Sequence, residues 1–217
     1  MPLFEYWRNP ETRFPEWSDR LGVPITSPTE LAFEFAVRPS AGRGKASYTD
    51  LMLTTANAAL AIEAKYLEPP YGTVDAWLGP NPTENRRQVL QGWFDVLERS
   101  IGCALDARSA AEIPYQLIHR MASVCSVSRP RRFVIYQVFD RSKRAYYETE
   151  LRRCREALGS SGIVLALALT SATPMSPYSP LLQRWDAGER DLSAEVKALL
   201  VAGSTFSFDP LEMIVVD

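Results

Sequence analysis

The sequence predicts a single α/β domain in which a mixed β-sheet is flanked by helices. Three segments between residues 31 and 66 alternate their side chains with a period of two, the pattern of β-strands. After residue 80, helical stripes alternate with further strand-like runs, which favours helices packed on a sheet. The chain has 217 residues, of which 46% are hydrophobic and 23% charged, so it can bury one sizeable core.

Bulk composition excludes several classes of protein. The net charge is −2, so the whole chain is not an electrostatic trap for nucleic acid. No apolar run approaches the roughly 18 residues that a membrane span requires, and the first residues lack the features of a secretory signal. We therefore expect a cytoplasmic protein without membrane association. The cysteines have no zinc-like spacing and are expected to be small buried hydrophobic residues: Cys103, Cys125 and Cys154.

Residues 1–30 are rich in aromatic residues and prolines and precede the predicted α/β domain, residues 31–217. Trp7, Phe14 and Trp17 are expected to pack onto that domain. The segment is therefore expected to be a wrap or a pair of short helices.

Three strands are expected, over residues 31–38, 48–54 and 60–66. Strict alternation places one set of side chains of the first strand together, namely Leu31, Phe33, Phe35 and Val37. In the second strand, Asp50 and Met52 share one side, and the other side carries Thr49, Leu51 and Leu53. In the third, Glu63 and Lys65 lie opposite Leu60 and Ile62. A connection with two glycines, residues 39–45, joins the first two strands.

One long helix is expected from Asn81 to Gly102. The run Asn81-Pro82-Thr83-Glu84 has the features of a helix start, and Gly102 suits the end. This helix is expected to pack on the sheet through Trp93, Phe94 and Leu97. The remaining expected elements are helices over 114–125, 145–158 and 191–201, strands over 133–139 and 163–169, and an edge strand over 213–216.

Two carboxylates and a lysine form the promising chemical cluster. If the second and third strands turn at Ala56-Asn57, Asp50 lies directly opposite Glu63, and Lys65 shares their face. Neighbouring carboxylates repel and need a proton or a cation, and Mg²⁺ prefers oxygen ligands. The alternative is an exposed set of salt bridges on a sheet face, which contributes little to stability.

This hairpin resembles the active-site pattern D-x(n)-(D/E)-x-K of the PD-(D/E)XK nuclease superfamily, in the runs Thr49-Asp50-Leu51-Met52 and Ala61-Ile62-Glu63-Ala64-Lys65. The resemblance covers about residues 30–140 and implies a restriction-endonuclease-like mixed sheet. It implies that Asp50 and Glu63 bind Mg²⁺ or Mn²⁺ with the carbonyl of Ala64, and that Lys65 handles the attacking water. Glu34 or Glu30 would be an additional acid. No proline precedes Asp50, which departs from the pattern.

The activity implied by this resemblance is Mg²⁺-dependent hydrolysis of phosphodiester bonds in DNA, in restriction or repair. The alternative is a catalytically silent protein that keeps the nuclease fold as an interaction scaffold. Metal-dependent cleavage separates the two. A homodimer is compatible with either.

Several residues are candidates for contacts with nucleic acid. Arg86, Arg87 and Gln88 begin the helix after the third strand, and Lys45 lies in the glycine-containing connection. Residues 129–155 are rich in Lys and Arg and are expected to hold phosphates. Aromatic residues that can stack on bases are Tyr71, Trp77, Tyr146 and Tyr147. The alternatives are a solvated helix face, a simple hairpin loop and core or rim packing of the aromatic rings. The sole histidine, His119, is a candidate general base, but a position on a helix surface or in the core is favoured.

Overall fold

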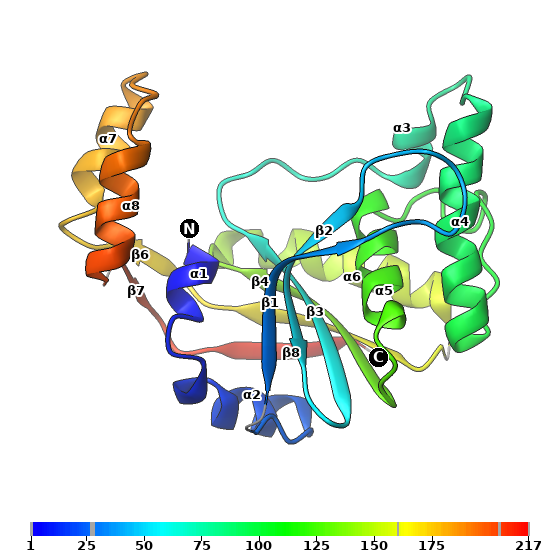
Figure 1. Ribbon diagram of the computed structural model, residues 1–217, viewed down its shortest axis with the longest axis horizontal. Helices are drawn as coiled ribbons and strands as arrows, with labels where there is room; N and C mark the ends of the chain where they lie inside the picture. The colour runs from blue at the N-terminus through cyan, green and yellow to red at the C-terminus, as the bar shows by residue number, and fades with distance from the viewer. Residues whose placement is uncertain (1, 27–28, 160, 204, 217) are drawn as a thin grey trace.

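A mixed six-stranded sheet forms the centre of the molecule, in the order β1-β2-β3-β4-β5-β8 (Figure 1). The computed structural model describes residues 2–26, 29–159, 161–203 and 205–216. The six strands are β1 (Glu30–Val37), β2 (Ser47–Thr54), β3 (Ala58–Lys65), β4 (Arg131–Val138), β5 (Ile163–Leu169) and β8 (Glu212–Val216). The first three are antiparallel, β3, β4 and β5 run parallel, and β8 pairs antiparallel to β5 at the edge. The predicted α/β class, mixed sheet and edge strand are therefore confirmed.

Helices cover both faces of this sheet (Figure 1). They are α1 (Pro2–Tyr6), α2 (Phe14–Leu21), α3 (Val74–Leu78), α4 (Glu84–Ile101), α5 (Tyr115–Ser126), α6 (Arg144–Leu158), α7 (Ser179–Asp186) and α8 (Ser193–Ala202). Short 3₁₀ turns lie at Pro10–Thr12 and Arg141–Lys143. A second, two-stranded sheet pairs β6 (Ala172–Pro174) with β7 (Phe206–Phe208). The sequence pattern did not predict α3, α7 or this small sheet, all of which are short.

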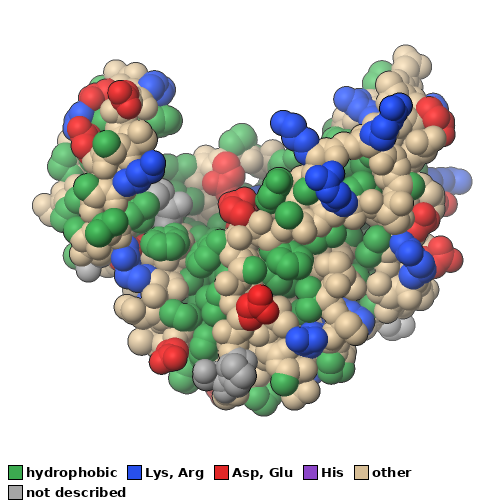
Figure 2. All heavy atoms as spheres, in the orientation of Figure 1, with side chains coloured by type: hydrophobic (Ala, Val, Ile, Leu, Met, Phe, Trp, Pro, Cys, Tyr) green, Lys and Arg blue, Asp and Glu red, His purple; other side chains and the backbone are tan. Residues whose placement is uncertain are grey.

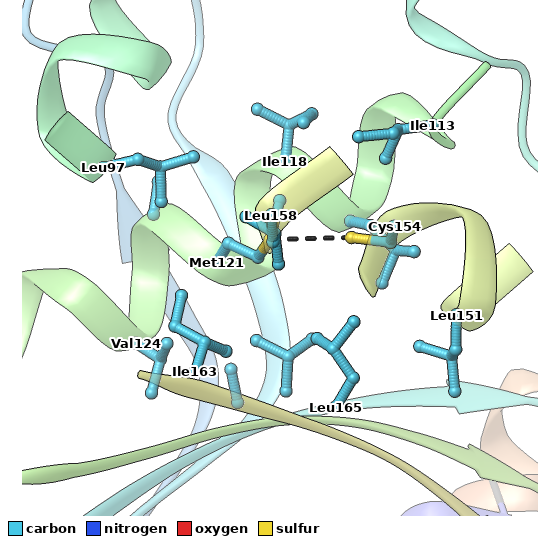
Figure 3. Packing of buried hydrophobic residues seen from close by; sticks show 14 of the residues in the cluster. Leu97, Ile113, Ile118, Met121, Val124, Leu151, Cys154, Leu158, Ile163 and Leu165 are labelled. Atoms are coloured by element: carbon cyan, nitrogen blue, oxygen red, sulfur yellow. Dashed lines mark hydrogen bonds between the residues drawn. The ribbon is translucent and has the colours of Figure 1, made fainter. Parts of the chain in front are cut away.

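The core on one face of the sheet is built by α4, α5 and α6. Trp93, Phe94 and Leu97 of α4 are buried, as predicted. However, α4 lies against α5, and α5 rather than α4 packs on the sheet. Figure 3 shows the centre of this core, where the Cys154 Sγ of α6 lies 3.7 Å from the Met121 Sδ of α5. The predicted apolar side of α4 is therefore confirmed, but it packs against the helix α5 and not, as predicted, on the sheet.

The long helix begins later than the sequence predicts. Thr83, not Asn81, is its N-cap: the Thr83 side chain accepts a hydrogen bond from the backbone N–H of Arg86 at 3.3 Å. Thr83 has an extended backbone, as N-cap residues do. The helix ends as predicted at Gly102, which has a positive φ of 66°.

The opposite face of the sheet is covered by the N-terminal segment. Trp7, Phe14 and Trp17 are buried there, in the same cluster as Leu51 and Leu53 of β2. The Trp7 indole donates a hydrogen bond to the Gln137 Oε1 at 2.9 Å, which ties the segment to the central strand β4. Residues 2–26 therefore contribute directly to the core of the sheet.

The alternation of side chains along β1 and β2 changes at Glu34 and Asp50, which the sequence did not predict. Before Glu34, Leu31 packs against the N-terminal face, whereas Val37 beyond it packs into the α4–α6 core. Glu34 has a φ of 53°, and such a left-handed residue reverses the side to which the following side chains point. In β2, the Thr49 hydroxyl likewise donates to the Ser123 Oγ of α5, instead of facing the same side as Leu51. The expected sides of Thr49, Phe35 and Val37 were therefore wrong.

Two further expectations concern the membrane and the cysteines. Among the described residues, no helix is long and apolar enough to cross a membrane. The three cysteines are free thiols; Cys125 and Cys154 are buried, and Cys103 is partly buried. The predicted role as small buried residues is therefore correct for two of the three.

Candidate active site

The β2–β3 hairpin has the register that the sequence predicts. It turns at Ala56-Asn57, where the Thr55 backbone N–H donates to the Ala58 carbonyl at 2.9 Å. The Thr55 hydroxyl also accepts a hydrogen bond from the Ala58 N–H, which stabilises the tight turn. Leu51 and Ile62 are the last paired residues of this ladder, and just beyond them Asp50 lies near enough to Glu63 for that charge to act on its pKa.

Asp50, Glu63, Ala64 and Lys65 line one cavity of about 800 Å³. The cavity lies at the C-terminal end of β3, where residues 66–73 leave the sheet and lead to α3 (Figure 1). Its other walls include α1, residues 68–72 and the start of α5. The described lining holds a single cationic side chain, Lys65, against four carboxylates: Glu34, Asp50, Glu63 and Glu68. We refer to this cavity as the acidic pocket.

Glu63 and Lys65 are buried, with exposed fractions of 2% and 4%. The Lys65 ammonium donates to the Glu63 Oε1 at 3.2 Å and to the Gln116 Oε1 at 2.6 Å. The Gln116 amide and the Arg120 Nε also donate to Glu63. The alternative of an exposed set of salt bridges is therefore excluded, because Glu63 and Lys65 are buried. Breaking a buried ion pair costs much more stability than breaking an exposed one.

Gln116 and Arg120 were not predicted as site residues. Both lie on α5, more than 50 positions along the chain from Glu63. They are spaced four residues apart and therefore point from one side of the helix. One buried turn of α5 thus provides the remaining hydrogen-bond donors to Glu63.

Asp50 has a different environment from Glu63. Its Oδ2 accepts a hydrogen bond from the Ala64 backbone N–H at 2.8 Å. In the described part of the chain, no group donates a hydrogen bond to the Oδ1. Burial, and secondly the charge of Glu63, raise the pKa of Asp50 to about 6. Asp50 is therefore the less compensated of the two carboxylates.

A second cavity, of about 450 Å³, adjoins the acidic pocket. Tyr71 and Gln116 line both cavities. Its charged side chains are all cationic within the described lining, namely Arg43, Lys45, Arg86 and Arg120. His119 lines it as well, and burial lowers the pKa of that imidazole to about 3, so it is neutral. We call this cavity the basic pocket.

The predicted nucleic-acid contacts divide into two groups. Lys45 and Arg86 line the basic pocket. Arg87 and Gln88 do not; they lie one and two positions along α4 and interact with Glu84, at 3.6 Å and 3.2 Å respectively. A helix turns about 100° per residue, so neighbours of Arg86 necessarily point elsewhere. Arg87 and Gln88 therefore lie outside both pockets, and their expected contact with nucleic acid stays a prediction.

The basic stretch of residues 129–155 is also not at this site. None of its arginines or lysines lines either pocket. Arg141 and Arg144 pair with Glu212 at 2.9 Å and 2.8 Å, and Arg152 pairs with Glu148. Tyr147 of this stretch is buried in the core. The basic residues of this stretch lie before and on β4, on the turn Arg141–Lys143 and on α6, and their expected contact with phosphates stays a prediction.

Figure 2 shows that the molecule is hollowed between two arms. Lys and Arg side chains gather along the arm formed by the β1–β2 connection, α3 and α4, and acidic side chains lie between the arms (Figure 2). The charges of the two pockets thus follow a wider pattern on this face.

Comparison with known proteins identifies a family but no activity. No curated protein and no solved structure matches the chain. One family, described as a domain of unknown function (DUF6946), matches residues 1–179, a range that contains every residue lining the two pockets. Since this match spans most of the chain, the protein belongs to the DUF6946 family.

Proposed function

We propose that this protein is a divalent-metal-dependent nuclease whose active site is the acidic pocket. The observation that carries the proposal is the shared cavity of Asp50, Glu63, Ala64 and Lys65. The order of the elements supports it. Asp50 lies on β2, Glu63 and Lys65 lie on the antiparallel partner β3, and α4, α5 and the parallel strand β4 follow. This is the arrangement that the resemblance to the PD-(D/E)XK superfamily implies.

The donor atoms of the pocket suit a hard cation. The described residues contain no group of three or more His, Cys, Asp or Glu arranged to hold a metal, so two carboxylates would provide the charge, those of Asp50 and Glu63. Mg²⁺ is commonly bound through one or two carboxylates while it keeps several waters. The Ala64 carbonyl is the third oxygen that the resemblance implies. When bound, the cation would polarise a phosphoryl oxygen and acidify water in the site.

Lys65 is positioned to act on the reacting groups. Its ammonium is fixed by Glu63 and Gln116 and is not free to rotate into solvent. A preorganised cation in a buried pocket stabilises negative charge that develops in a transition state. We assign to Lys65 the orientation of the attacking water, and to Gln116 and Arg120 the positioning of Lys65 and Glu63.

A silent interaction scaffold is the second candidate. The observation in its favour is that Lys65 and Arg120 already compensate the charge of Glu63. A metal at Glu63 would have to share that carboxylate with Arg120. Under this alternative, the pocket is a structural network that binds neither metal nor scissile phosphate.

The experiment that separates the two candidates is a cleavage assay with the wild-type protein. Supercoiled plasmid and labelled single strands are incubated with Mg²⁺, with Mn²⁺ or with EDTA, and the products are separated on gels. Calorimetry measures binding of each metal in parallel. The proposal expects metal binding and cleavage that EDTA abolishes. Absence of both with every substrate would favour the scaffold.

A further inference from the structure

We propose that the basic pocket is a subsite for one unpaired nucleotide, with the base against its aromatic rings and a phosphate against its cations. This inference rests on the proposed function for its biological meaning, because it names the substrate class as single-stranded or frayed nucleic acid. Binding at the pocket itself does not require metal chemistry.

Aromatic rings with exposed surface form the rim of the basic pocket. Tyr48 and Tyr71 line it and are 50% and 49% exposed. Trp77 stacks on Tyr115 with ring centroids 4.0 Å apart and planes tilted by 19°. A base that stacks on such rings contributes ~1–3 kcal/mol, whatever its identity. The pocket therefore offers sequence-independent contacts to a base.

Around these rings, the Arg86 guanidinium and the backbone that carries Arg43 are held by hydrogen bonds. The Arg86 guanidinium lies 5.7 Å from the Trp77 ring centroid and donates to the Leu78 carbonyl at 3.2 Å. Arg43 is fixed to α4 by two hydrogen bonds with Asn85, one from its N–H at 2.7 Å and one to its carbonyl at 2.8 Å. The loop that carries Arg43 and Lys45 thus forms a wall whose backbone is tied to α4 at Arg43.

A close approach of backbones fixes the same loop. A Cβ at Gly92 of α4 would lie 2.5 Å from the Ala41 backbone nitrogen, so only glycine allows this contact. The Gly92 carbonyl accepts hydrogen bonds from the Ser40 N–H and hydroxyl, at 3.3 Å and 3.0 Å. The position of the basic wall relative to α4 is therefore built into the fold.

The size and place of the pocket favour a single nucleotide. Its volume of about 450 Å³ is that of a small-molecule site, and a stacked base pair of a duplex cannot enter it. Gln116, which bonds Lys65 and Glu63, forms part of its wall. A strand with one base seated here would carry its neighbouring phosphate toward the acidic pocket. The contrast in charge also fits, since without a cation the acidic pocket repels phosphate.

The test measures binding in EDTA, so that cleavage plays no part. Fluorescence anisotropy compares a labelled oligothymidylate with a blunt duplex of equal length. We expect at least about tenfold tighter binding of the single strand. The double variant Tyr48→Ala/Tyr71→Ala should weaken that binding about 5- to 100-fold, and Arg86→Ala should weaken it several-fold. The matched controls are Arg99→Ala on the exposed face of α4 and Trp185→Ala; Trp185 is 48% exposed on α7, and neither residue lines a pocket of the site.

Equal affinity for both probes, no measurable binding, or equal losses in the variants and their controls would each overturn the inference. The outcomes also separate it from the proposed function. Strand binding at these residues without cleavage in Mg²⁺ or Mn²⁺ would leave this inference standing and remove the nuclease. Metal-dependent cleavage of duplexes without any preference for single strands would support the nuclease and overturn the proposed nucleotide subsite.

Discussion

The acidic and basic pockets share Tyr71 and Gln116 but are built in opposite ways. Asp50, Glu63 and Lys65 of the acidic pocket come from adjacent strands of one hairpin, and Glu63 and Lys65 are held by a buried network. The basic pocket is assembled from a loop, two helices and the start of a third, and its cations Arg43 and Lys45 are exposed. The difference teaches that one region is organised for placing a few atoms accurately, and the other for holding a flexible, charged ligand.

Arg120 lines the basic pocket and also binds Glu63 of the acidic pocket, and its removal should have the largest effect on stability. Arg120 is 4% exposed and donates to Glu63 and to the Ser47 hydroxyl. Arg120→Met leaves a buried carboxylate with one cation fewer, which costs about 3–5 kcal/mol. Urea denaturation measures this loss. The matched control is Arg152→Met, which breaks the exposed pair with Glu148 and should change the free energy of unfolding by at most about 1 kcal/mol. Equal small losses would show that the network around Glu63 is not important for the fold.

Asp50 should destabilise the metal-free protein at neutral pH. Its pKa is about 6 in the folded protein against an ordinary value of 3.8, so the folded state binds the proton more tightly. The protonated Asp50 therefore contributes stability to the folded state, in full below about pH 4, and this contribution is lost as the pH rises through 6. At pH 8, Asp50→Asn should therefore be more stable than wild type by up to about 3 kcal/mol, and the gain should vanish near pH 4.

Thermal and urea unfolding of both proteins in EDTA, across this pH range, measure the difference. If Asp50→Asn is less stable than wild type at pH 8, the ionised Asp50 does not destabilise the folded protein and the prediction is contradicted. Added Mg²⁺ should stabilise the wild type but not Asp50→Asn, because a ligand that binds only the folded state adds to its stability.

The wall of the basic pocket can be disturbed without touching a charged group. Gly92→Ala forces the Ala41 backbone away from α4, which should cost about 1–3 kcal/mol and weaken oligothymidylate binding. Gly44→Ala in the same loop is the control, since its Cβ would meet no atom within 4 Å. It should change neither property by more than about 0.5 kcal/mol. Similar results for the two variants would mean that the loop is not held by this contact.

The two pockets also differ in how far sequence could predict them. The tight turn and the strand register were sufficient to bring Asp50 close to Glu63, although the alternation of β2 changes at Asp50 itself. Gln116 and Arg120 could not be predicted, since nothing local relates α5 to β3. The reversal at Glu34 was equally hidden, because a left-handed backbone at a residue other than glycine leaves no mark in a pattern of alternation.

For the basic pocket, Lys45 and Arg86 were predicted as separate hints, and only the fold brings them together. Charge density along residues 129–155 did not indicate where the basic pocket lies, since no arginine or lysine of that stretch lines it. Local chemistry is therefore predictable where one supersecondary unit contains it, and not where tertiary packing assembles it.

Cleavage by Lys65→Met, compared with wild type in Mg²⁺ and in EDTA, tests the central claim most directly. Methionine keeps the length of the side chain, and Gln116 and Arg120 remain to bind Glu63. The control is Lys197→Met on the exposed face of α8, and circular dichroism checks the fold of each protein. We predict metal-dependent cleavage by wild type and by Lys197→Met, and a loss of about 10²–10³-fold in Lys65→Met with oligonucleotide binding retained. Undiminished cleavage by a folded Lys65→Met, or no cleavage by the wild type with either Mg²⁺ or Mn²⁺, would contradict the assignment of the acidic pocket as a nuclease active site.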